Sequence, residues 1–254
     1  MASVQQITRT AADACNAWLT PRLGMSFRPA AEAITTPDAK LGGQPVWLEA
    51  PQWPLSRTDG ALMMFIGQFP VPQSDGRIAY LFMTAEDPGL RETWDPEAGE
   101  NAVIIQPGGR IPDVVRTADA ATGPALWTRG TTWNDEVPVE LSVDLTSLDP
   151  ATDRFLDAKA AEGDAERRGL YPDPYEEVDD SADTTRSYVG GTPVFWQPHL
   201  PSVPPGTMAW RFFLQLDGAE GIDDDPYALN FGGGTAYVFL SHDTLEGRLT
   251  WDCV

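Results

Sequence analysis

Two histidines, His199 and His242, are the only imidazoles in the chain. A hydrolytic site of the Ser–His–acid type would have to use one of them, because imidazole is its general base. His242 follows the apolar run "YVFLS" and precedes Asp243, so one hypothesis is a histidine–carboxylate pair at the end of a strand. Neither histidine stands in a G-x-S-x-G elbow. The alternative is an exposed histidine in a turn.

The segment "LDGAEGIDDDP", residues 216–226, is rich in acidic side chains. Asp217, Asp223 and Asp225 together offer several hard oxygens, which are the ligands that Ca²⁺ prefers. Their spacing departs from that of an EF-hand loop, and a solvated acidic loop is the alternative. Calcium is the one cofactor that the sequence suggests. The glycine-rich segment "FGGGTAY" has no lysine after its glycines, so it is not a phosphate-binding loop.

Gln68 and Gln215 each interrupt an otherwise apolar run, "FIGQF" and "FFLQL". A buried amide needs hydrogen-bond partners, because leaving it unpaired costs about 1–3 kcal/mol. Either these glutamines tie neighbouring loops to a sheet, or they line a cleft and bind a ligand. Trp47 and Trp196 lie beside the same loops, where they either form the floor of a shared groove or pack into the core.

These residues belong to three blocks that occur twice, in the same order and at a nearly constant offset. The blocks are 42–47 with 190–195, 65–69 with 212–216, and 79–84 with 236–241. Self-similarity of this kind predicts repeated structure. We therefore expect an internal repeat, 40–145 and 188–254, with a pseudo-twofold axis relating two compact units.

The remaining segments predict the elements around the repeat. Apolar residues at helical spacing predict an N-terminal helix over 3–19, and Asp149-Pro150 predicts the start of a linking helix. This helix and the acidic loop after it occupy 149–187. The whole chain, 1–254, is expected to form a single α+β domain, rich in sheet and built from two β-rich halves.

Charge is the strongest global signal. Seventeen Lys and Arg oppose 38 Asp and Glu, which gives a net charge of −21. Such a surface repels phosphate backbones and anionic lipids, so we expect neither nucleic-acid nor membrane binding, and it attracts a basic protein partner. The start of the chain lacks the apolar core of a secretory signal, and a cytoplasmic location is expected.

The order and number of the blocks resemble the YwqG-like family, a bacterial domain of unknown function. The resemblance covers roughly residue 40 to the C-terminus and rests on two Gly-Gly-x-Pro loops, on "FIGQF" and "FFLQLD", and on "NFGGGTAYVFLS". It implies a cytoplasmic, sheet-rich α+β domain without established activity, with some relatives suspected of immunity roles. Relatives often carry an acid in the glycine segment, where this chain reads Phe231-Gly232-Gly233-Gly234.

Three hypotheses about function follow from these residues. The first is a non-enzymatic module, immunity-like in its sharpest form, that binds a basic protein. The second is a small-molecule binder or hydrolase with a cleft between the repeats, using Gln68, Gln215, His242 and Asp243. The third is a calcium-binding protein. The sequence favours the first because of the charge.

Overall fold

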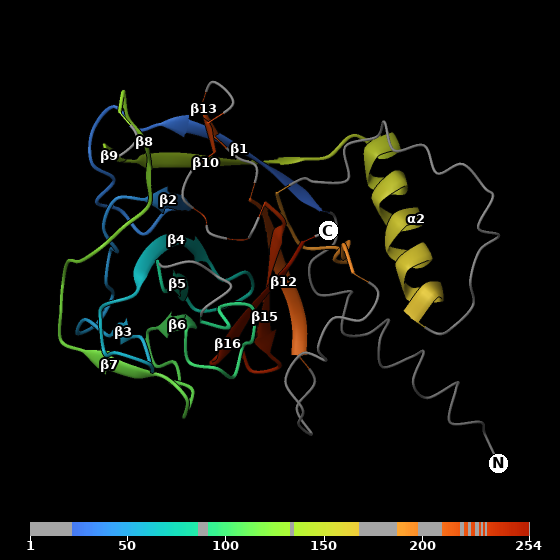
Figure 1. Ribbon diagram of the computed structural model, residues 1–254. Helices are drawn as coiled ribbons and strands as arrows, with labels where there is room; N and C mark the ends of the chain where they lie inside the picture. Colours follow the sequence, from blue (N-terminus) through green and yellow to red (C-terminus); the bar gives the residue numbers. More distant parts are fainter. Residues whose placement is uncertain are drawn as a thin grey trace, which may run out of the picture.

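The computed structural model describes residues 22–85, 91–132, 135–167, 187–197, 210–218, 221–222, 225–226, 229, 231 and 233–253. The helix expected at 3–19 lies outside these residues. So do His199, Asp223 and most of the acidic loop expected before 187. Figure 1 shows the described chain as a β-barrel with one helix at its side.

Ten strands of the described chain close into an antiparallel barrel in the order β1-β10-β2-β4-β5-β6-β16-β15-β12-β11. Their bounds are β1 (Leu23–Pro29), β2 (Lys40–Gly42), β4 (Met64–Pro70), β5 (Ile78–Met83), β6 (Asn101–Gln106), β10 (Glu140–Ser147), β11 (Tyr188–Val189), β12 (Trp210–Asp217), β15 (Thr235–Ser241) and β16 (Gly247–Asp252). β11 pairs with β1 and completes the ring.

The barrel divides into two halves of the same strand order. One half reads β10-β2-β4-β5-β6, and the other reads β1-β11-β12-β15-β16. A β-bulge interrupts the pairing at the same place in each, between Phe65 and Gly67 and between Phe212 and Leu214. β1 thus belongs to the second half, although it precedes the whole first half in the chain.

The two seams between the halves differ. β1 pairs with β10 in continuous register from Leu23↔Ser147 to Pro29↔Leu141. In the described residues, β6 and β16 share only the register pair Val103↔Gly247. The second seam must therefore be held by side chains and loops.

Side-chain alternation along each strand separates an inner core from outer clusters. On β5, Ala79, Leu81 and Met83 belong to the central cluster, which takes residues from strands all round the barrel and therefore fills its interior. Residues from the opposite faces form two outer clusters. Tyr80 lies in the outer cluster of the first half, and Tyr237 in that of the second.

The outer faces are covered by short elements. β3 (Trp53–Leu55) pairs with β7 (Arg116–Ala118), β8 (Trp127–Arg129) with β9 (Glu136–Pro138), and β13 (Gly221–Ile222) with β14 (Asp225–Pro226). Trp53 is buried over the first half. Helix α2 (Pro150–Arg167) begins where Asp149 accepts hydrogen bonds from the backbone N–H groups of residues 151 and 152.

Helix α2 joins the barrel through its first turns, beside the second half (Figure 1). Leu156 packs into the outer cluster of that half. Arg22, with a side chain only 2% exposed, forms ion pairs with Asp153 and Asp157 at 2.8 Å each. Because these acids are four residues apart, they present both carboxylates on one helical face.

The predicted α+β class is wrong. Strands make up 42% of the chain and α2 only 7%, so this is a mostly-β barrel. One reason is β1, "LGMSFRP", which contains Gly and Pro, has only one fully buried residue and shows little strand pattern of its own. Its strand conformation comes from pairing with β10 and β11, which is a tertiary effect that local propensity does not contain.

Candidate functional site

In the first half, the side chains of Gln68 and Tyr80 both bind the backbone of one loop residue, Val46, and we call this arrangement the loop clamp. They face each other across β4 and β5. The Gln68 Oε1 atom accepts from the Val46 N–H at 2.9 Å, and the Tyr80 hydroxyl donates to the Val46 carbonyl at 2.6 Å. Both backbone groups of Val46 are thereby satisfied as if by a neighbouring strand.

The second half repeats this clamp. Gln215 and Tyr237 are cross-strand partners on β12 and β15. The Gln215 Oε1 atom accepts from the Val194 N–H at 3.2 Å, and the Tyr237 hydroxyl donates to the Val194 carbonyl at 2.9 Å. Burial raises the pKa of the Tyr237 phenol far above its usual value, so the hydroxyl remains a donor.

The loops entering these clamps are set by paired glycines. Gly42 and Gly43 both have φ of 64°, and Gly190 and Gly191 have φ of 81° and 68°. This left-handed backbone is open to glycine at little steric cost.

Both glutamines are 0% exposed, and their carbonyl oxygens bind the loops. They stand in different halves, with β5, β6, β16 and β15 between β4 and β12 along one side of the ring. The structure therefore does not bring Gln68 and Gln215 together in one cleft, and neither faces a ligand from solvent.

Trp47 and Trp196 follow the two clamped residues and have different surroundings. The Trp47 ring lies 4.9 Å from that of Tyr80, and its indole N–H donates to the Ala121 carbonyl. The Trp196 side chain is 38% exposed, and its indole N–H donates to the Thr235 hydroxyl at 2.9 Å. Phe195, rather than Trp196, packs against Tyr237.

The end of the next strand carries a polar residue in each half. In the first half it is Gln106, opposite Ile78 on β5. Its Oε1 atom accepts from the N–H groups of residues 48 and 49 at 3.1 Å each, and its Nε2 atom donates to the carbonyls of Ala50 and of the Gln52 side chain. All the hydrogen-bonding capacity that this amide needs is met within the chain.

The equivalent position in the second half is Asp252, opposite Thr235 at the start of β15. Its Oδ2 atom accepts from the Gln197 N–H at 2.9 Å. Its Oδ1 atom is buried and makes no hydrogen bond within the described residues. The Tyr237 hydroxyl donates to the Val194 carbonyl but lies close enough to Asp252 for each group to influence the pKa of the other. The residue is 4% exposed, and burial raises the pKa of its carboxyl.

Sequence reasoning missed Asp252. The signal was present in the repeat, since "VIIQ" and "LTWD" end the last apolar strand of the two halves with a polar side chain. The two tetrapeptides have no identical residue, and their equivalence follows only from their matching pairing, one with β5 and the other with β15.

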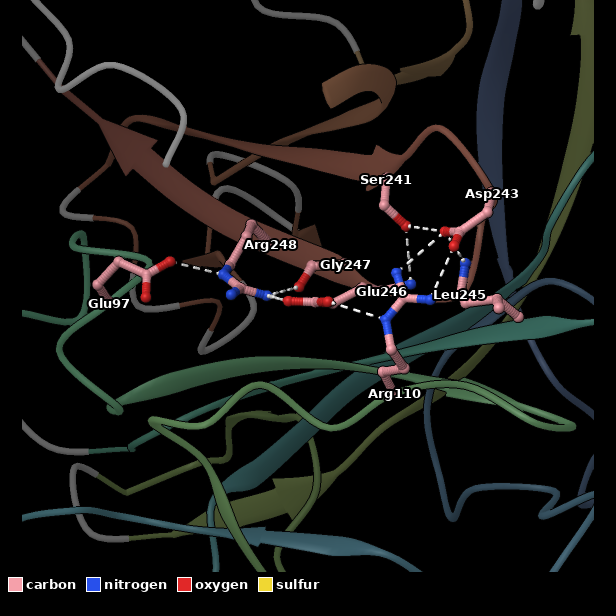
Figure 2. A network of polar contacts seen from close by, with 8 residues as sticks. All are labelled: Glu97, Arg110, Ser241, Asp243, Leu245, Glu246, Gly247 and Arg248. Carbon is pink, nitrogen blue, oxygen red and sulfur yellow. Dashed lines mark hydrogen bonds and ion pairs between the residues drawn. The ribbon is translucent and has the colours of Figure 1, made fainter. Parts of the chain in front are cut away.

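Asp243 lies at the seam between β6 and β16, in the network that Figure 2 shows. Arg110 binds the Asp243 carboxylate with two nitrogens, at 2.7 and 3.1 Å, and reaches Glu246 with a third at 3.3 Å. Glu246 in turn pairs with Arg248 at 2.7 Å, and Arg248 pairs with Glu97 at 2.7 Å. These ion pairs connect β16 and the turn before it to the segments that flank β6, where the two strands have little backbone pairing.

This arrangement does not form a Ser–His–acid site. The Ser241 hydroxyl donates to Asp243 at 2.7 Å, and His242 is exposed. The Arg110 guanidinium holds the pKa of the Asp243 carboxyl well below its usual range, which makes it a weak proton acceptor. The geometry therefore gives Asp243 the role of an anchor for Arg110.

Within the described residues, no group of three His, Cys, Asp or Glu side chains is placed to hold a metal ion. Of the acids expected to bind calcium, Asp217 is 7% exposed and its N–H donates to the Ser187 hydroxyl. Asp225 lies on β14, and Asp223 lies outside the described residues. Over the same part of the chain, no helix has the length and apolar character needed to span a membrane.

Comparison with known proteins gives no family. No model of a protein family matches the chain, and no curated protein matches it. The resemblance to the YwqG-like family stays a prediction.

Proposed function

We propose that this protein is a non-enzymatic module that binds a basic protein partner. The observation that carries the proposal is the net charge of −21 together with the way its cations are used. Lys40, Arg22 and Arg248 have side chains only 1%, 2% and 10% exposed, and each forms an ion pair with an acid of the same chain. These three cations are therefore neutralised by acids of the chain itself.

Acidic side chains are exposed on the short elements that cover the barrel. Asp113 and Asp119 flank β7 on the surface, and Asp135 and Glu136 stand on the β8–β9 hairpin. Fields of one sign raise the association rate with a partner of the opposite sign and weaken as salt is added. The rigid barrel supplies a fixed surface for this contact.

The test is capture of partners from a lysate of the source organism, with washes at low and at high salt. The expected result is a basic protein that is eluted by salt and then forms a defined complex with the purified barrel. A variant with Asp113, Asp119 and Glu136 changed to Lys should bind it more weakly. Failure to capture any basic partner that salt elutes would count against the proposal. So would a control variant with the same number of acids reversed on another face, if it binds the partner as weakly as the first variant does.

A further inference from the structure

The repeat provides an internal comparison for Asp252. Gln106, in the first half, is an amide that both accepts and donates, and its donors are used by the carbonyls of Ala50 and Gln52. The carboxylate of Asp252 can only accept when ionised. In the first half, the chain thus supplies hydrogen-bond partners for every polar atom at this position. In the second half, the Oδ1 atom of Asp252 has no donor.

An unpaired buried acceptor is costly to leave, and charged acceptors are costlier than neutral ones. The cost falls sharply when a donor that carries positive charge supplies the missing hydrogen bond. Among the described residues, no cation pairs with Asp252; the basic residue on its own strand face, Arg248, pairs with Glu97 and Glu246. A cation that donates to the Oδ1 atom would therefore come from outside the described residues.

The surroundings of Asp252 also suit a cation. Its cross-strand partner Thr235 accepts the indole N–H of Trp196, so the partly exposed indole lies beside the Thr235–Asp252 pair. An aromatic face attracts ammonium and guanidinium groups through its quadrupole.

We infer that Asp252, Thr235 and Trp196 form a site for one hydrogen-bonding cation, the guanidinium or ammonium group of a basic side chain on a protein partner. The cation donates to the Oδ1 atom of Asp252, and its alkyl stem lies against the Trp196 indole. This inference rests on the proposed function and names the contact within it. A free small cation has the same chemistry, so the experiment separates the two sources.

The measurement is ¹³C NMR of the aspartate carboxyl groups during titration with a Gly/Ser peptide that carries a single arginine. The expected result is a saturable shift of the Asp252 resonance at constant pH, with no shift when citrulline replaces arginine. Asp252→Asn should weaken peptide binding about tenfold or more, which is the worth of one charge-assisted hydrogen bond. Asp75→Asn changes the net charge equally at an exposed site in the turn between β4 and β5 and should change the affinity less than about twofold.

Methylguanidine serves as the free-cation arm. Weaker binding than that of the peptide supports a protein side chain as occupant, and equal or tighter binding overturns that assignment. If the chemical shift of the Asp252 carboxyl does not change when the arginine peptide is added, the proposed site is wrong. If basic partners are still captured in a salt-sensitive way, the proposed function stands without this site. If none is captured while the resonance shifts, Asp252 remains a cation site, but its assignment to a protein partner fails together with the proposed function.

Discussion

Gln106 and Asp252 occupy equivalent positions at the ends of β6 and β16, yet only the amide has partners for all its polar atoms. Two halves that share a strand order, a bulge and a loop clamp thus differ in charge at one buried position. The difference turns a closed hydrogen-bond network into an incomplete one, and it can be examined by mutation without reference to any ligand.

Asp252→Asn is expected to stabilise the free protein at neutral pH by about 1 kcal/mol or more, because it removes a buried charge that lacks a partner. The pKa of Asp252 is raised above its ordinary 3.8 in the folded state. The stability that its protonated form contributes is therefore fully present below pH 3.8 and is lost as pH rises through the folded pKa. Urea unfolding of the wild type and of Asp252→Asn should show that the difference between their unfolding free energies grows as the pH rises. A difference that shrinks with rising pH would contradict the assignment.

Gln106→Glu is the mirror experiment in the first half. Ionised glutamate cannot donate to Ala50 and Gln52, so two acceptors lose their partner and a charge is buried. We expect a loss of about 1–3 kcal/mol at pH 7. The loss should shrink in acid, because the protonated side chain donates again. A substitution without effect at pH 7 would mean that the amide does not close this loop.

Gln68→Leu and Gln215→Leu are expected to destabilise the protein by similar amounts, about 1–3 kcal/mol each, because each leaves the N–H of Val46 or Val194 without its acceptor. Hydrogen exchange of these two amides should quicken in the matching variant alone. Tyr80→Phe and Tyr237→Phe remove the other bond of each clamp and serve as companions. Faster exchange of the Val194 amide in Gln68→Leu would show that the clamps are not independent.

Gly42→Ala is expected to be far more damaging than Gly76→Ala. Both glycines have positive φ, 64° and 75°, so both alanines bear backbone strain of about 1–2 kcal/mol. A Cβ at Gly42 would also lie 2.0 Å from the Val139 carbonyl oxygen, whereas nothing lies within 4 Å at Gly76. The additional clash should cost roughly 1–3 kcal/mol. Thermal unfolding separates the two, and equal losses would contradict the close packing of β2 on the segment before β10.

Asp243→Asn tests the seam network. Its side chain is 47% exposed, so the ion pair with Arg110 should contribute at most about 1 kcal/mol at low salt. Because the pKa of Asp243 is lowered, this contribution is present above pH 3.8 and disappears as the pH falls toward the folded value. Urea unfolding at two salt concentrations is the measurement. A large loss that is insensitive to salt would mean that the seam depends on Asp243 for packing rather than for charge.

Local signals in the sequence predicted several elements well. Asp149-Pro150 marks the start of α2, and the apolar runs mark β4, β5, β12 and β15. These signals are local because a helix cap and a buried strand each leave a pattern within a few neighbouring residues. β1 left no such pattern, and with it the closure of the barrel and the β-dominated class escaped prediction.

The sequence by itself determined the order of the repeated blocks, the presence of one amide in each apolar strand, and the acidic charge. The tertiary structure alone decided that β1 joins the second half, that Arg110 holds Asp243, and that Asp252 is the counterpart of Gln106. Patterns of burial repeat along the chain and can be read from it. Partners that are 133 or more residues apart, as Arg110 and Asp243 are, meet only when the barrel closes.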